Sequence, residues 1–163
     1  MAMKKRIVCF FALICSLNIN AQSVVKMSIN DVQELINSKD DGTVLILNFW
    51  ATFCKPCVAE IPDFISITAA EKSQKVKLIL ISLDDKNAYP KKLRAFARRN
   101  HFANNLAWLN ETDADSFLPK IDPSWSGSIP ATLFINKKTG ARKFVEGEMN
   151  AIEFKKALVE IIN

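Results

Sequence analysis

Hydrophobic positions along the chain alternate between continuous runs and helical spacings, and this pattern predicts an α/β domain. Residues 43–50 (TVLILNFW) and 76–83 (VKLILISL) are nearly continuous apolar runs, typical of strands buried on both faces. Residues 57–70, between them, have apolar positions at helical spacing, so the three segments predict a βαβ unit with parallel strands. By the same reasoning, further helices are expected at 28–38, 91–99, 113–120 and 150–161, and further strands at 106–109, 131–136 and 142–145. The resulting order, α-β-α-β-α-β-α-β-β-α, predicts a mixed sheet with helices on both faces.

The N-terminus has a different pattern, which predicts an export signal. Residues 4–6 are basic, and residues 7–17 form an uncharged, mostly apolar run. This is the order of the charged region and the short hydrophobic region in a secretory signal peptide. The eleven residues of the apolar run are too few to cross the roughly 30 Å of a bilayer, so a permanent membrane anchor is not expected.

Cleavage of this segment defines the predicted domain boundaries. A cut after Ala21 gives a signal peptide at 1–21 and one mature domain at 22–163, which is then expected outside the cytoplasm, in the periplasm. Cys15 leaves open a second possibility, in which a lipid-bearing cysteine tethers the protein. The residue before such a cysteine is normally small, whereas Ile14 is large, so tethering is the less favoured alternative.

Composition and charge exclude several classes of protein. The 163 residues are 49% hydrophobic and 24% charged, as in an ordinary globular domain. The formal net charge of +5 falls to +2 when the three basic residues at 4–6 are removed, so no nucleic-acid partner is expected. Cys9 and Cys15 are removed as well, which leaves Cys54 and Cys57. Two cysteines cannot form the disulfide scaffold of a domain this size, so they are expected to be a local pair with a chemical role.

The pair lies in the sequence Cys54-Lys55-Pro56-Cys57, directly after a predicted buried strand and at the start of a predicted helix. Unpaired N–H groups at a helix N-terminus stabilise a thiolate, which is the nucleophilic form of cysteine. Lys55 adds a nearby cation, and Pro56 suits the first helical turn, where its missing donor costs little. A spacing of three residues allows a disulfide. We therefore expect Cys54 to be the exposed attacking cysteine and Cys57 to be the more buried resolving one.

Other roles compete with redox chemistry for this pair. A structural disulfide that closes so short a loop removes little chain entropy and stabilises weakly. A zinc site needs four ligands, and the mature chain has no further cysteine and a single histidine, His101. Two thiolates could hold Cu(I) in a copper-handling chaperone, but no positioned histidine or methionine supports that role. Redox chemistry without a metal or organic cofactor is therefore preferred.

Two motifs resemble those of a known family. Residues 48–57 (NFWATFCKPC) and 128–134 (SIPATLF) are similar to the active-site stretch and the cis-proline strand of thioredoxin-like proteins, above all the extracytoplasmic TlpA/ResA-like thiol-disulfide oxidoreductases. The resemblance covers residues 28–162 and implies a thioredoxin-like fold with a cis Ile129–Pro130 bond. The stretch 84–130 is longer than in thioredoxin, which implies an inserted α–β element before the cis-proline.

The resemblance also implies roles for residues outside the cysteine pair. Glu60 lies where many family members have an active-site glutamate, which would move protons to or from Cys57; the alternative is a surface or capping residue. A cis bond would expose the backbone of Ile129, so that Ile129 and Pro130 hold a substrate chain as a short strand. Trp125, in the preceding loop, is either a substrate-contacting aromatic residue or a partly buried anchor.

Two residues depart from the family pattern. Phe53 stands directly before the first cysteine, where the family usually has tryptophan. Asn48 stands where thioredoxin has a buried acid, so proton transfer cannot use that side chain, although asparagine is common there among TlpA/ResA-like members.

These observations together predict an extracytoplasmic thiol-disulfide oxidoreductase that reduces disulfides in exported proteins. The resemblance implies a membrane thiol carrier as electron donor and makes apocytochrome c one possible substrate. We expect a monomer that needs no metal, cofactor or nucleic acid. The enzymatic rival is a thiol peroxidase of the same fold. Peroxiredoxin-like sites place threonine three residues before the reactive cysteine and after a proline, whereas Thr52 is two residues before Cys54 and no proline precedes it.

Overall fold

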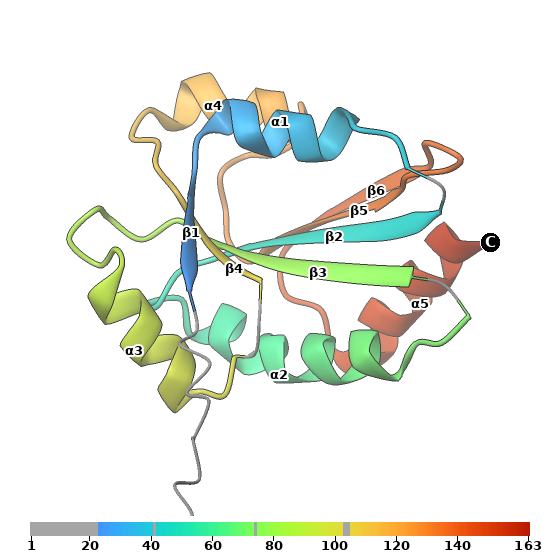
Figure 1. Cartoon of the computed structure of the whole chain (residues 1–163), viewed down its shortest axis with the longest axis horizontal. Helices are drawn as coiled ribbons and strands as arrows, with labels where there is room; N and C mark the ends of the chain where they lie inside the picture. The colour runs from blue at the N-terminus through green and yellow to red at the C-terminus, as the bar shows by residue number, and fades with distance from the viewer. Residues whose placement is uncertain (1–22, 41, 74, 103–104) are drawn as a thin grey trace, which may run out of the picture.

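The computed structural model describes residues 23–40, 42–73, 75–102 and 105–163, and the predicted signal peptide at 1–21 lies outside them. In this described part of the chain, six strands form one sheet and five helices cover its two faces (Figure 1). No helix of the described ranges is both long enough and apolar enough to cross a membrane.

The strands lie in the spatial order β1-β4-β3-β2-β5-β6. Neighbouring strands from β1 to β2 are parallel, and β5 runs antiparallel to both β2 and β6. The strands are β1 (Val24–Met27), β2 (Thr43–Trp50), β3 (Lys75–Ser82), β4 (Leu106–Leu109), β5 (Ala131–Asn136) and β6 (Arg142–Glu146). The predicted mixed sheet is confirmed.

Helices pack on both faces of the sheet, as predicted. In Figure 1, α1 and α4 lie on one face, and α2, α3 and α5 lie on the other. The helices are α1 (Ile29–Asn37), α2 (Lys55–Ala70), α3 (Lys91–Arg99), α4 (Ala114–Ile121) and α5 (Ala151–Ile162). Each face of the sheet has its own hydrophobic cluster. The cluster under α2 and α5 contains Phe64 and Phe154, and the cluster under α1 and α4 contains Val32 and Phe117.

Strand β2 is central to the fold, because all of its residues are buried and it pairs with strands on both sides. Its side chains enter the two clusters alternately: Val44, Ile46 and Trp50 on the α2 side, and Leu45, Leu47 and Phe49 on the opposite side. By the same alternation, Asn48 projects toward α2. The strand ends just before the cysteine motif and so fixes where that motif begins.

Two features of the N-terminal half differ from the sequence prediction. Strand β1 was not predicted, because a four-residue strand with only its two end residues buried gives too short an alternation to detect. Pairing with β4 at the edge of the sheet stabilises it. Helix α2 begins at Lys55, two residues before the predicted start at Cys57, because Cys54 takes the N-cap position.

The segment between β3 and β5 contains α3, β4 and α4, so the predicted additional α–β element is present. The segment ends at the Ile129–Pro130 bond, which is cis as predicted; the Tyr89–Pro90 bond is also cis. The register between β2 and β5 pairs Phe49 with Ala131. This pairing places Pro130 beside the end of β2, where the cysteine motif starts.

Candidate active site

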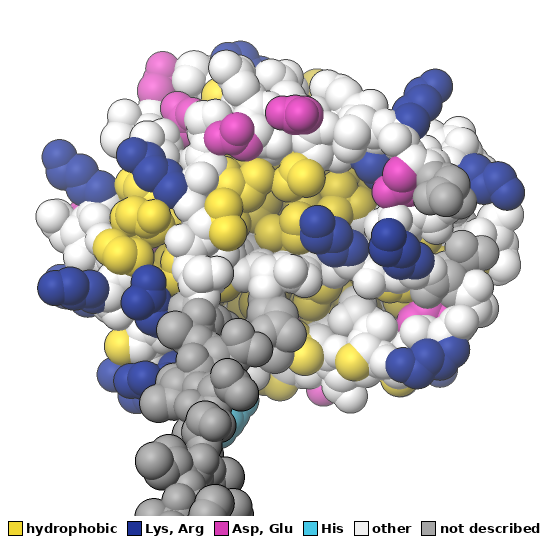
Figure 2. All heavy atoms as spheres, in the orientation of Figure 1, with side chains coloured by type: hydrophobic (Ala, Val, Ile, Leu, Met, Phe, Trp, Pro, Cys, Tyr) yellow, Lys and Arg dark blue, Asp and Glu magenta, His cyan; other side chains and the backbone are white. Residues whose placement is uncertain are grey.

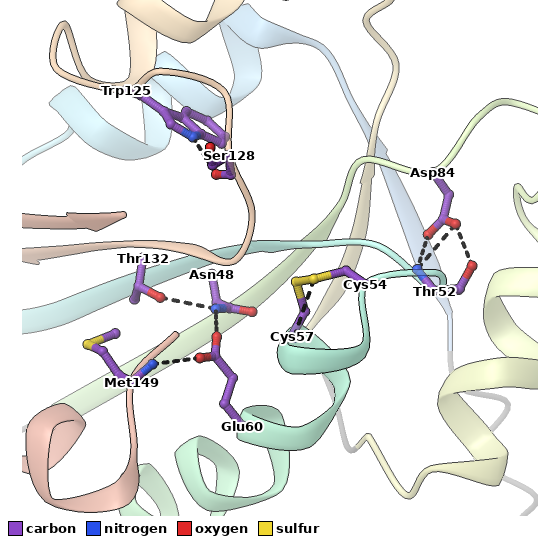
Figure 3. Close-up of a disulfide and its surroundings, with 10 residues drawn as sticks. All are labelled: Asn48, Thr52, Cys54, Cys57, Glu60, Asp84, Trp125, Ser128, Thr132 and Met149. Carbon is purple, nitrogen blue, oxygen red and sulfur yellow. Dashed lines mark hydrogen bonds between the residues drawn. A yellow bond between two sulfur atoms is a disulfide. The ribbon is translucent and has the colours of Figure 1, made fainter. Parts of the chain in front are cut away.

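The two cysteines form a disulfide at the N-terminus of α2 (Figure 3). Cys54 is the N-cap residue, and its Sγ accepts a hydrogen bond from the backbone N–H of Cys57 at 3.3 Å. In the reduced protein the same N–H and the partial positive charge of the helix end would stabilise a thiolate on Cys54. Cys54 is 8% exposed and Cys57 is fully buried. Cys54 is therefore the more exposed of the two cysteines, as predicted. Only a small part of its surface reaches solvent.

Three residues beside Cys54 shape its surroundings: Phe53 before it, and Lys55 and Pro56 after it. Pro56 occupies the first turn of α2, as predicted. Lys55 is the first residue of the helix and its side chain is exposed, so its effect on the thiolate stays a prediction. Phe53 is 74% exposed, which is unusual for a large apolar side chain. Cys54, the expected attacking cysteine, thus follows an apolar side chain that is open to solvent.

Glu60 is buried one turn further along α2, with 6% of its surface exposed. Its carboxylate accepts two hydrogen bonds, from Asn48 Nδ2 to Oε1 at 3.1 Å and from the backbone N–H of Met149 to Oε2 at 3.0 Å. Burial raises the pKa of Glu60 to about 7; the two hydrogen bonds oppose this rise and the nearby Glu148 charge adds to it. The alternative of a surface or capping glutamate is therefore wrong. A carboxylate with this pKa can take up and release a proton near neutral pH.

Asn48 and Thr132 complete the buried polar group behind the disulfide (Figure 3). Asn48 is fully buried on β2, and its Nδ2 also donates to Thr132 Oγ1 on β5 at 3.0 Å. Sequence reasoning noted Asn48 only as a departure from thioredoxin and missed Thr132. The contact joins segments 84 residues apart, so local sequence patterns gave no signal for it.

Asp84 is a second residue that sequence reasoning missed. It follows β3, is 7% exposed, and accepts hydrogen bonds from the backbone N–H of Thr52 at 3.0 Å and from Ser82 Oγ at 2.7 Å. The hydroxyl of Thr52 also donates to this carboxylate. Asp84 therefore fixes the turn that leads from β2 to Cys54. The sequence did offer a signal for Asp84: it is a polar residue that directly follows a predicted buried strand, next to the end of β2.

Replacing Asp84 with asparagine is expected to lower the free energy of unfolding by about 1 to 2 kcal/mol, because a neutral amide accepts these hydrogen bonds more weakly and leaves a donor unpaired. Urea denaturation followed by circular dichroism measures this change. The adjacent, exposed Asp85 offers the matched control Asp85→Asn. Equal destabilisation by both substitutions would contradict the assigned role of Asp84.

The turn at Ile129 and Pro130 lies beside the cysteine motif. Pro130 is buried, and its carbonyl accepts a hydrogen bond from Gly147 N–H at 2.9 Å. Ile129 is half-buried, and among the described residues neither its N–H nor its carbonyl makes a hydrogen bond. The backbone of Ile129 is thus free to pair with an extended chain, which is the arrangement that substrate binding by this turn requires.

Trp125 is an anchor and does not present its ring for substrate contact. It is 5% exposed, with its ring centroid 4.8 Å from that of Phe49 and 5.8 Å from that of Phe144. Its Nε1 donates to the carbonyl of Ser128 at 2.9 Å. Of the two interpretations of Trp125, substrate contact is therefore wrong and the buried anchor is correct, because its ring is packed against Phe49 and Phe144. Its hydrogen bond instead holds the loop that leads to Ile129.

Comparison with known proteins places this site in a family. The sequence model of the AhpC/TSA family matches residues 20–142, which is more than half of the chain. The chain belongs to the AhpC/TSA family. Sporulation thiol-disulfide oxidoreductase A of Bacillus subtilis is 30% identical over 122 residues, which are 75% of this chain and 70% of that protein. Thiol-disulfide oxidoreductase ResA of Geobacillus thermodenitrificans is 24% identical over 120 residues, 74% of this chain and 64% of that protein.

A solved structure supports the same placement. The crystal structure of StoA from Bacillus subtilis matches with a TM-score of 0.53 and 28% identity, over 72% of this chain and 83% of that chain. The thioredoxin-like fold and the resemblance to ResA-like proteins are thus confirmed for this AhpC/TSA family member. The chain spans about two thirds of the length of the two curated relatives.

Proposed function

We propose that this chain, a thiol-disulfide oxidoreductase by its relatives and by its cysteine pair, works as a reductase of disulfides in exported proteins. The observation that carries the proposal is the Cys54–Cys57 disulfide at the N-terminus of α2, backed by the buried Glu60. A purely structural disulfide of this size would stabilise little and would not need a buried, titratable carboxylate behind it.

The reaction proceeds by two exchange steps. The Cys54 thiolate attacks one sulfur of the substrate disulfide; a Cys54–substrate S–S bond forms, and the other substrate sulfur leaves with the electron pair and takes a proton. Cys57 then loses its proton and attacks Cys54 Sγ. The enzyme disulfide forms, and the second substrate sulfur leaves as a thiolate. Two electrons pass to the substrate, and a dithiol donor returns the enzyme to its reduced state.

Glu60 acts as the proton acceptor for Cys57 in the second step. Both side chains lie on the inner side of α2, three residues and so one turn apart, and both are buried. A buried thiol cannot release its proton directly to water, and Glu60, with a pKa of about 7, is able to take the proton up.

The substrate chain lies across the turn at Ile129 and Pro130. The unpaired backbone groups of Ile129 give main-chain hydrogen bonds to an extended segment, and the exposed Phe53 gives it an apolar contact beside Cys54. Main-chain recognition tolerates different sequences, which suits an enzyme that acts on several partly unfolded substrates.

We place the protein in the periplasm as a monomer, exported by the segment at 1–21. In this setting a membrane thiol carrier returns electrons to the pair, and apocytochrome c is one candidate substrate. Figure 2 shows Lys and Arg side chains spread over the drawn face, with fewer Asp and Glu side chains, several of them along its upper part. The drawn face thus carries both signs of charge.

The reduction potential of the Cys54–Cys57 pair tests the direction of electron flow. Redox titration followed by thiol alkylation is expected to give a value near or below about −230 mV, in the range of thioredoxin-like reductants. A value near about −120 mV would make the protein an oxidant and overturn the proposed direction. Peroxide consumption and Cu(I) titration of the reduced protein test the two rival functions, and we expect neither turnover of peroxide nor tight copper binding.

A further inference from the structure

Asn48 has a buried oxygen atom without a hydrogen-bond partner. The side chain is fully buried, and Nδ2 uses both of its protons, one for Glu60 Oε1 at 3.1 Å and one for Thr132 Oγ1 at 3.0 Å. Within the described residues, nothing donates to Oδ1. Buried side-chain oxygen atoms are nearly always paired, so this one requires an explanation.

The unpaired oxygen is directed toward the cysteine pair. Asn48 projects from β2 to the face that α2 covers, and its amide is oriented by the two oxygen acceptors that hold Nδ2. Figure 3 shows Oδ1 on the opposite side of the amide, pointing to the disulfide. A disulfide sulfur carries no hydrogen and cannot donate. In the oxidised state the pair therefore supplies no donor to Oδ1.

Reduction turns the sulfur atoms into hydrogen-bond donors. Two electrons and two protons convert the disulfide into two thiols, and the S–H of Cys57, which is fully buried, then needs a protein acceptor. We propose that Asn48 Oδ1 accepts a hydrogen bond from the Cys57 thiol in the reduced protein. This inference rests on the proposed function, because only a pair that is reduced during its working cycle forms that thiol.

Asn48 is then a positioning residue that acts through Cys57. Its Nδ2 donates to Glu60, and its Oδ1 accepts from the thiol. The carboxylate and the thiol thus bind opposite ends of the same amide. The bond keeps Cys57 protonated while Cys54 attacks a substrate. It exists only in the reduced state, so it favours the dithiol over the disulfide and makes the pair a weaker reductant than it would otherwise be.

Redox titration of the full chain against glutathione tests this stabilisation, with the peptide that carries both cysteines read by alkylation and mass spectrometry. Asn48→Leu removes the acceptor with little change in volume. We expect the equilibrium to move toward the disulfide by about three- to tenfold, which corresponds to a potential lower by about 14 to 30 mV. Thr132→Val is the matched control, because it removes the other partner of Nδ2 and leaves Oδ1 in place; we expect a change below about twofold.

A double variant separates this role from a merely structural one. If Asn48 acted only by holding Glu60, Asn48→Leu would have no additional effect on the potential in a Glu60→Gln background. We expect the shift toward the disulfide to persist in that background. Its disappearance there, or an unchanged potential in the single variant, would overturn the proposal while leaving the proposed function intact.

The S–H stretching band of Cys57 gives a readout that requires no variant at position 48. The infrared difference between the reduced protein and its reduced Cys57→Ser variant isolates this band. We expect it at lower frequency, and broader, than the band of a free thiol, and the same in Thr132→Val. A band at the frequency of a free thiol would overturn the proposal. If the native pair could not be reduced reversibly at all, the proposed function itself would fail first.

Discussion

Cys54→Ser is expected to lower the rate of disulfide exchange by on the order of a thousandfold or more, because it removes the sulfur that attacks the substrate. Cys54 is the sulfur that accepts the helix N-terminal hydrogen bond and reaches solvent, whereas Cys57 is fully buried. The reduction of insulin by dithiothreitol, followed by turbidity, measures the rate.

Cys57→Ser is the matched variant, and it should fail in a different way. The first exchange step still takes place, but no second sulfur resolves it, so the protein accumulates as a mixed disulfide with its substrate. Non-reducing gel electrophoresis detects this species. If Cys54→Ser trapped the substrate and Cys57→Ser did not, the two roles would be reversed and the accessibility argument would be wrong.

The second large effect is a pH dependence of stability that arises from Glu60. Its pKa rises from 4.5 to about 7 on folding, so between these values the folded protein binds more protons than the unfolded chain. The contribution of Glu60 to stability is therefore fully present below about pH 4.5 and is lost as the pH rises through about 7. Because a tenfold change in proton affinity corresponds to about 1.4 kcal/mol, this loss amounts to about 3 kcal/mol.

Glu60→Gln removes this titration. The free energy of unfolding of the variant, relative to the native protein, should increase by about 3 kcal/mol between pH 4 and pH 8, measured by urea denaturation at each pH. Asp63→Asn, which changes an exposed residue on the same helix, is the control and should keep the inflection near pH 7. A relative stability of Glu60→Gln that does not vary with pH would contradict the assignment of a raised pKa to Glu60.

The elements that the sequence predicted well are those with a clear apolar pattern of their own. Strands β2, β4 and β5 have the bounds that were expected, and α3 does as well. Strand β1 was missed because its formation depends on pairing with β4, more than 80 residues away, and not on a pattern of its own. Tertiary pairing decides the state of a short segment that, like β1, has two exposed residues at its centre.

In the site, too, features set by neighbouring residues were predictable, and contacts between distant residues were not. The cysteine motif is local, so its place at a helix N-terminus was predictable from the strand before it and the helix after it. The environment of Glu60 was not, because Asn48 and Met149 approach it from other elements. Trp125 had two open interpretations, and only the rings of Phe49 and Phe144 packed against it decide between them.

The hydrogen bond from Met149 N–H to Glu60 has a consequence for the order in which the protein becomes functional. The two residues are 89 positions apart, whereas Cys54 and Cys57 are separated by three. During synthesis from the N-terminus, the cysteine motif is complete long before the chain that leads into α5 exists. Until that segment is in place, Glu60 lacks the Met149 hydrogen bond, so the proton-accepting side of the site is completed last.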